Sequence, residues 1–207
     1  HAMVIPPSRL VDYARPKDAE IIDATLQYTA SLGSKAYTGY SFAWLAALYA
    51  AAKNGEKALE YLEIFWRYFC SVNTFHLNGD YTKQGYSDLT YRPFTLEGNF
   101  CALDALQEML LYAENGVLEL FPAVPSAWRD VSFRTLRAWG GVLVSAARRG
   151  SKLLRAAFTA ENDVSFLLRG TVQDLRFTGG ESEPTENGML ITLKKGETLS
   201  IQTENDA

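Results

Sequence analysis

The stretch of residues 93–100 places an acidic side chain, a glycine and an amide side chain directly before a helical pattern. Apolar residues recur at helical spacing over residues 100–113, so this segment is predicted to be a helix. Asn99 is a preferred N-cap residue type, and Asn115-Gly116 is a suitable helix stop. Glu97 should therefore lie just before a helix N-terminus, where the helix dipole favours an ionised carboxylate. It is a candidate for chemistry, and the alternative is an ordinary acidic residue in a connecting loop.

The long segment before this helix, residues 71–98, is rich in side chains that hold polar ligands. Tyr, Asn, Asp and Arg suit ligands with both polar and apolar surfaces, such as sugars. A loop of this length is usually functional or disordered, and its aromatic content argues against disorder. His76 and Asp80 suggest a metal pair, but no second His or Cys lies at ligand spacing, so no metal is expected. Asp88 is a second acidic candidate.

Three further helices are predicted upstream, over about residues 18–32, 40–53 and 56–69. Asn54-Gly55 joins the last two into an antiparallel hairpin. Trp44 lies near the end of its helix that adjoins the loops, so it could stack on a sugar ring or belong to the core. Trp66 is predicted to be a core residue. On the helix over residues 100–113 the predicted inward residues are Leu103, Leu106, Met109 and Leu110, and the predicted outward residues are Asp104, Gln107 and Glu108.

After Gly116 the periodicity changes from helical to alternating. Short strands at regular spacing, separated by turns rich in Gly and Asn, are typical of an antiparallel sandwich. The predicted fold is therefore α+β, with antiparallel helices in residues 1–121 and a β-sandwich in residues 122–207. The predicted strands lie near residues 117–121, 131–138, 142–147, 152–159, 163–169, 173–177, 188–193 and 198–202.

Composition excludes several classes of protein. The 207 residues are 47% hydrophobic and 13% aromatic, which is typical of a folded globular chain rather than a disordered one. The net charge is −4 with both signs interspersed, so no nucleic-acid partner is expected. No apolar run approaches the roughly 18 residues of a membrane span, and no cofactor-binding motif such as a phosphate loop is present. Cys70 and Cys101 are expected to be free thiols.

Four stretches in order along the chain resemble glycoside hydrolase family 95, which contains α-L-fucosidases and some α-L-galactosidases. Residues 96–100, Leu-Glu-Gly-Asn-Phe, resemble the family's Ile-Asp-Gly-Asn-Phe. Residues 38–44 resemble its Thr-Gly-Trp-Ser-x-Ala-Trp, and residues 116–128 and 136–141 resemble its Leu-Pro-Ala-Leu-Pro and Leu-Arg-Ala-Arg-Gly-Gly segments. The resemblance implies the last helices of an (α/α)6 toroid followed by a C-terminal β-sandwich. It also implies a carbohydrate partner, a glycan that contains fucosyl or galactosyl units.

The chemistry that the resemblance implies is inverting hydrolysis. A general acid protonates the leaving oxygen while a base on the opposite face activates water, and the two carboxyl groups are usually about 6.5–9.5 Å apart. In this family asparagine side chains hold the water, and the aspartate of the Asp-Gly-Asn stretch polarises them. Glu97 stands at that aspartate's position, so it is the predicted catalytic residue. The resemblance also makes Tyr40, Trp44, Tyr91 and Asn99 the predicted substrate-binding residues.

This sequence departs from the family pattern at several positions. Glu97 carries one more methylene than aspartate, which moves the carboxylate by roughly one bond length, and a misplacement on that scale can cost on the order of 100-fold in rate. Tyr91 stands where the family has histidine, Tyr40 where it has tryptophan, and Cys101 where it has glycine.

The family's general acid and water-holding asparagines lie upstream of the matched region. The chain is therefore expected to be a portion of a longer enzyme and inactive alone; a chain that needs another subunit and a degenerate homologue are the other interpretations. A non-catalytic carbohydrate-binding module, or an assembly module, is the alternative. Because a partial toroid leaves apolar helix faces uncovered, either self-association or a missing N-terminal portion is expected.

Overall fold

A computed structural model of the chain describes residues 2–170 and 175–203. The chain forms two compact units, and Leu110–Phe121 and residues 126–207 group together as the second. The first unit holds residues 1–109 and Pro122–Pro125. The helices-then-sandwich order predicted for an α+β chain is confirmed. Within the described residues, no helix is both long and apolar enough to cross a membrane.

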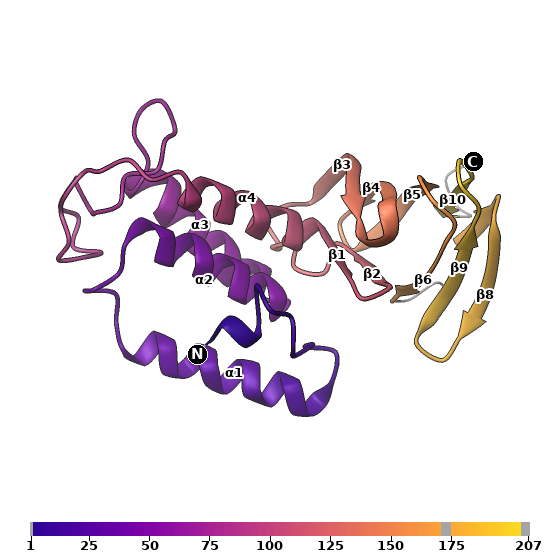
Figure 1. Cartoon of the computed structure of the whole chain (residues 1–207), viewed down its shortest axis with the longest axis horizontal. Helices are drawn as coiled ribbons and strands as arrows, with labels where there is room; N and C mark the ends of the chain where they lie inside the picture. The colour runs from indigo at the N-terminus through magenta and orange to yellow at the C-terminus, as the bar shows by residue number, and fades with distance from the viewer. Residues whose placement is uncertain (1, 171–174, 204–207) are drawn as a thin grey trace. The chain divides into compact units, whose positions relative to one another are not determined.

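The first unit contains four α-helices and a short 3-10 helix, η1 (Ala2–Val4). They are α1 (Pro16–Ser31), α2 (Gly39–Ala51), α3 (Gly55–Tyr68) and α4 (Glu97–Leu110). The tight turn between α2 and α3 makes the predicted hairpin, and the Asn54 side chain caps α3 by accepting a bond from the Lys57 backbone N–H at 3.0 Å. Figure 1 shows η1 and the segment after it lying between α1 and α2.

That N-terminal segment is part of the helical core. Ala2 and Ile5 are buried with Ile22 and Leu26 of α1 and with Leu45, Leu48 and Ala52 from α2 and its end. The segment therefore packs as an element of the unit. The segment is short and rich in proline, and its sequence shows no helical or alternating period. Its role in the core could therefore not be predicted from the pattern.

Helix α4 begins and ends three residues earlier than predicted. Asn99 lies inside it and is not its N-cap, because its side chain bonds outside the helix: Oδ1 accepts from the His76 N–H and Nδ2 donates to the Thr74 carbonyl, both at 2.8 Å. Glu97 is its first residue.

The buried face of α4 is also different from the predicted one. Ala102, Ala105 and Met109 are buried, whereas Leu103 is 52% exposed. Glu108 was expected to face solvent but is 7% exposed, because it pairs with Arg9 of the N-terminal segment. The Arg9 Nη1 and Nη2 atoms donate to Glu108 Oε1 and Oε2 at 2.5 and 2.6 Å. On α3, Trp66 is 42% exposed, so the predicted core position for it is wrong.

The second unit is a sandwich of two five-stranded sheets. One sheet has the order β1-β2-β6-β9-β8 and the other β3-β4-β5-β10-β7. All neighbours are antiparallel except β2 and β6, which pair in parallel. The core between the sheets includes Leu118, Val144, Phe158, Phe166 and Ile191, each fully buried or nearly so. The strands are β1 (Leu111–Glu114), β2 (Val117–Leu120), β3 (Asp130–Ala138), β4 (Val142–Arg149), β5 (Lys152–Ala160), β6 (Val164–Arg169), β7 (Leu175–Thr178), β8 (Glu181–Thr185), β9 (Gly188–Leu193) and β10 (Thr198–Thr203).

Two strands were missed. Residues 111–113 were assigned to the helix, but Leu111–Glu114 forms a hairpin with β2. Asn115 and Gly116 have φ values of 50° and 79°, as the type I′ hairpin turn requires, so this pair turns a hairpin rather than only stopping a helix. All of β8 is exposed, so it shows no alternation that could identify it. Of the strand predicted at 173–177, the first two positions lie outside the described residues.

The Arg9–Glu108 ion pair yields a stability prediction. Replacing Arg9 by Met should lower the free energy of unfolding by about 3–5 kcal/mol, because the Glu108 carboxylate would stay buried without its charged partner. Urea unfolding followed by circular dichroism at a helical wavelength measures this.

Two matched variants serve as controls. Lys57→Met removes an exposed partner of Glu60 and should cost less than about 1 kcal/mol. The double variant with Arg9→Met and Glu108→Met should be more stable than Arg9→Met alone. Equal losses from Arg9→Met and Lys57→Met would contradict this account of the pair.

Candidate functional site

An open hollow of about 320 Å³ lies on the helical unit beside α2 and α4. Three of the residues predicted for the site, Tyr40, Trp44 and Glu97, line it together. Its volume is at the lower end of small-ligand sites, which combine an apolar lining with a few polar groups. The other lining residues are Pro6, Pro7, Ala47, Phe100, Cys101 and Asp104.

Glu97 reaches the hollow from the first turn of α4. Its side chain is exposed. The walls of the hollow come from α2, α4 and the N-terminal segment. Asp104 follows two turns later on the same helix, about 10 Å along the axis. The hollow therefore has a carboxylate at two places along one wall.

Tyr40 lies in the first turn of α2 and is 37% exposed. Partial burial raises the pKa of its phenol above the ordinary value, and the neighbouring Cys101, Glu97 and Asp104 raise it further. Burial also raises the pKa of the Cys101 thiol, to about 11. At neutral pH both groups therefore remain protonated, and the Tyr40 hydroxyl can donate as well as accept a hydrogen bond.

Trp44 follows Tyr40 by one turn of α2 and is half-buried. Its indole Nε1–H donates to the Pro6 carbonyl at 3.3 Å, which ties α2 to the N-terminal wall of the hollow. The contact satisfies the one polar atom of the ring, so the rest of the indole is an apolar surface. Pro6 and Pro7 were not predicted to belong to any site.

Two of the predicted site residues do not line the hollow. Asn99 holds the backbone of the loop before α4 through the His76 N–H and the Thr74 carbonyl. Tyr91 is 45% exposed in that loop, where its hydroxyl accepts a long bond from Asn78 Nδ2 at 3.5 Å. Asn99 thus does not line the hollow but holds the loop next to it. A contact between Tyr91 and substrate stays a prediction.

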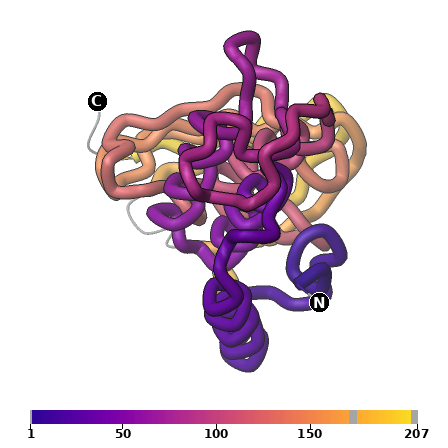
Figure 2. The backbone as a smooth tube through the Cα atoms, turned by 90° about the vertical axis from the view of Figure 1, so that its left-hand side faces the viewer, coloured from indigo at the N-terminus to yellow at the C-terminus, as the bar shows by residue number. Residues whose placement is uncertain are grey.

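The loop between α3 and α4, which projects from the unit on the side away from α1 (Figure 2), is organised around a buried carboxylate. Asp80 is fully buried and accepts bonds from the Gln84 and Tyr86 N–H groups at 3.1 and 3.0 Å. Burial alone would raise the pKa of Asp80, but these donors and the Thr82 hydroxyl hold it below its ordinary value. Asp80 is therefore a structural anion rather than a candidate ligand.

His76 has a structural position that was missed when only a metal role was considered. It is fully buried, and its ring packs against Phe65 with a centroid distance of 5.3 Å. Its Nδ1 atom lies 2.9 Å from the Thr95 carbonyl oxygen and 2.8 Å from the Thr95 hydroxyl. The nearest sequence signals were Gly39, before Tyr40, and Gly98, after Glu97, because a glycine often marks a position where another group approaches the backbone closely.

In residues 2–170 and 175–203, no group of three or more His, Cys, Asp or Glu side chains is placed to hold a metal ion. Cys70 and Cys101 are free thiols, as the sequence predicted.

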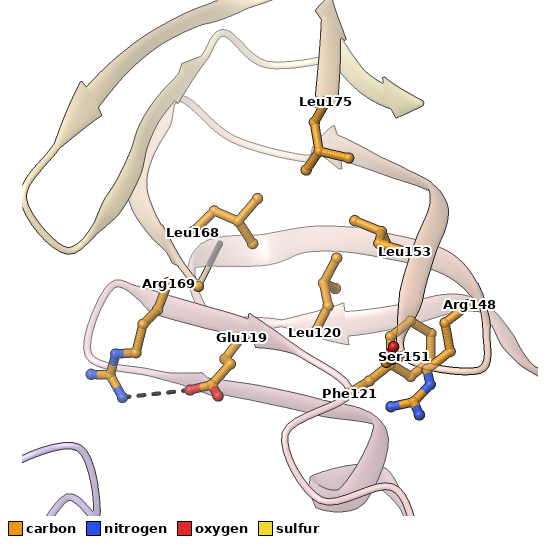
Figure 3. A pocket seen from close by; sticks show the side chains of 10 residues that line it. Glu119, Leu120, Phe121, Arg148, Ser151, Leu153, Leu168, Arg169 and Leu175 are labelled. Carbon is orange, nitrogen blue, oxygen red and sulfur yellow. Dashed lines mark ion pairs between the residues drawn. The ribbon is translucent and has the colours of Figure 1, made fainter. Parts of the chain in front are cut away.

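A second hollow, of about 220 Å³, lies in the sandwich unit (Figure 3). Leu120, Leu153, Leu168 and Leu175 face one another across it, and the Arg169–Glu119 ion pair, at 3.7 Å, lies to one side. No predicted site residue lines it. Arg148 lies over the Phe121 ring and donates to the Gly150 carbonyl at 2.7 Å. The polar groups of this hollow are thus largely occupied with one another.

Comparison with known proteins agrees with the motifs. Residues 1–110 match the model of the glycosyl hydrolase family 95 catalytic domain. The chain is also similar to alpha-L-fucosidase 2 of Arabidopsis thaliana, with 29% identity over 151 residues. The aligned segment is 72% of this chain but only 17% of that relative, so the chain spans a small part of the relative's length. Because the family model covers more than half of the sequence and includes α1 to α4, the chain belongs to glycosyl hydrolase family 95.

Proposed function

We propose that this chain is the base-side portion of an inverting glycoside hydrolase that acts on α-L-fucosides or α-L-galactosides. The observation that carries the proposal is the hollow in which Glu97, Tyr40 and Trp44 meet. A carboxylate and a phenol offer hydrogen bonds to sugar hydroxyls, and the indole offers an apolar surface to a ring face. The family membership supports a carbohydrate substrate.

Glu97 is proposed to be the carboxylate that polarises the groups that hold the attacking water. It lies in the first turn of α4, where the partial positive charge of the helix N-terminus interacts favourably with a carboxylate. Its extra methylene relative to the family's aspartate lets the carboxylate extend from the helix end into the open hollow. Asn99 is proposed to act indirectly, by fixing the loop that leads into α4, whereas Tyr91 is still proposed to contact the substrate.

The alternative, a non-catalytic module in which the sandwich binds carbohydrate, has less support. Such modules present exposed aromatic side chains to sugar rings. Among the described strongly exposed large hydrophobic residues of the sandwich unit, Trp139 is the aromatic one, at 44% exposure. A flat aromatic strip is therefore not formed by the described part of the sandwich.

The first test is sugar binding by the purified chain. Methyl α-L-fucopyranoside or methyl α-L-galactopyranoside should bind, and Glu97→Gln should weaken binding roughly 10- to 100-fold, since a hydrogen bond to a charged group contributes about 1.5–3 kcal/mol. Two-dimensional NMR titration measures the dissociation constant and locates the shifted residues.

Asp88→Asn is the matched control, because Asp88 is an exposed carboxylate of the loop that does not line the hollow. It should leave the dissociation constant unchanged. Shifts confined to the sandwich, or equal losses in both variants, would overturn the proposal that Glu97 contacts the sugar.

The chain alone is predicted to hydrolyse no aryl or 2-linked α-L-fucoside. Inversion needs an acid and a base on opposite faces of the sugar. Glu97 and Asp104 both project from α4, so they lie on one wall of the hollow rather than across it. Release of fucose is measured by a coupled assay. Turnover that Glu97→Gln or Asp104→Asn abolishes would show that the chain is a complete catalyst.

The exposed side of α4 yields a prediction about association. Phe100 and Leu103 are 63% and 52% exposed. We propose that further helices of the same catalytic domain cover them in the longer enzyme, since most of the relative's length lies outside the aligned segment. Without that cover the isolated chain should self-associate through this face.

Sedimentation velocity at several concentrations tests this. The double variant with Phe100→Glu and Leu103→Lys should sediment as a monomer under conditions in which the wild type is dimeric or larger. Leu190→Lys, on an exposed leucine of β9, should leave the association unchanged. A wild-type monomer at all concentrations would refute the prediction.

A further inference from the structure

The ring of His76 fills the space between the N-terminal ends of α2 and α4. On one side is Gly39, the first residue of α2, where an added Cβ would lie 2.4 Å from His76 Nε2. On the other side is Gly98, the second residue of α4, where an added Cβ would lie 2.4 Å from His76 Nδ1. Both helix ends therefore touch the imidazole so closely that no side chain fits between.

These two glycines are the direct neighbours of the two polar residues of the hollow. Gly39 precedes Tyr40, and Gly98 follows Glu97. A ring that separates the glycines must also separate the backbones that carry the phenol and the carboxylate.

The backbone around the ring is held from both directions. The His76 N–H donates to Asn99 Oδ1 at 2.8 Å, and the His76 carbonyl accepts from the Thr95 N–H at 3.2 Å. The next residue, Leu77, donates its N–H to the Phe69 carbonyl at 2.7 Å. His76 is thus bonded to α4 and linked through its neighbour to the end of α3.

We propose that His76 is a positioning residue whose imidazole sets the separation of Tyr40 and Glu97 across the sugar hollow. This inference rests on the proposed function for the role of the hollow, but the spacing itself can be tested without any sugar. His76 does not line the hollow, so it acts through the two helix ends.

The protonation state of the ring fits a rigid spacer. Nδ1 lies within hydrogen-bond distance of both the carbonyl and the hydroxyl oxygen of Thr95, whereas the buried Nε2 has no hydrogen-bond partner among the described residues. Nε2 faces the N-terminus of α2, whose positive end opposes a positive charge on the ring.

Burial lowers the pKa of His76, against the opposing effects of the Thr95 carbonyl and the Glu97 carboxylate. Cys70, whose backbone forms an isolated β-bridge with that of His76, stays neutral because burial raises the pKa of its thiol to about 11. The imidazole is therefore neutral at pH 7.

The pH dependence of stability follows from the direction of the His76 pKa shift. A histidine with a lowered pKa binds its proton more readily when unfolded, so stability contributed by His76 is present above about pH 6.5 and is lost as the pH falls below it. In His76→Leu this loss should be smaller than in the wild type. Thermal unfolding between pH 7.5 and 5 measures the difference.

The spacing is tested by the titration of Tyr40, followed by NMR of its ring carbon. His76→Asn retains an amide donor toward Thr95 but shortens the side chain. The gap should then close, Glu97 should approach Tyr40, and the pKa of Tyr40 should rise above its wild-type value. Thr95→Val removes the hydroxyl contact but keeps the ring, so it should leave the Tyr40 titration unchanged. A folded His76→Asn variant with an unchanged Tyr40 titration would overturn the proposal.

If His76→Asn folds poorly, a second pair of variants tests whether the ring fills the gap between the helix ends. Gly98→Ala alone should destabilise the protein, because its Cβ meets the ring, although alanine is the better helix former. In a His76→Ala background, which removes the ring atoms that this Cβ would meet, the same substitution should be tolerated or stabilising. Equal effects in both backgrounds would show that the ring does not fill this gap.

Sugar binding separates the two proposals. If the wild type binds methyl α-L-fucopyranoside, His76→Asn should bind it about tenfold more weakly, since a displacement near 1 Å is costly at a preorganised site. If the wild type binds no sugar, the proposed function fails, while the Tyr40 titration still tests the spacer. Unchanged affinity in a folded His76→Asn variant would contradict the positioning role.

Discussion

The close packing of one imidazole against two helix ends is the constraint on which the helical unit's site depends. The imidazole lies between Gly39 and Gly98, so its size sets the distance between the N-terminal ends of α2 and α4. Hard contacts of this kind resist both closing and opening, because protein interiors are close-packed. The polar network of Asn99, Thr95 and Thr74 then holds the loop backbone around that ring. The hollow owes its width to packing rather than to the polar residues that line it.

The sequence predicted the order of elements well because the signals were local. The helical and alternating periods identified α1 to α4 and most strands, and the four motifs identified the family. Of the predicted site residues, the structure brings Tyr40, Trp44 and Glu97 into one hollow. Each of the three belongs to a motif that begins a helix, so its place followed from where the helix starts.

The misses have a common physical cause, which is contact between distant parts of the chain. Glu108 has the sequence appearance of a solvent-facing residue, but it is buried in an ion pair with Arg9, 99 positions away. Asn99 has the type of an N-cap but bonds the loop 23 and 25 residues upstream. Leu111–Glu114 follows a helical period, yet pairing with β2 outweighs its propensity. No pattern within one segment could have shown these partners.

The parallel pairing of β2 with β6 has a consequence for how the sandwich forms during synthesis. The β1–β2 hairpin can close as soon as its turn is made, but Val117–Leu120 acquires its second neighbour only when Val164–Arg169 has been made. Until then one side of β2 presents unpaired backbone groups, a surface that can pair with another nascent chain. Late closure of long-range pairs slows folding, so a ribosome-bound intermediate that ends before residue 164 is the form of this protein most in need of a chaperone.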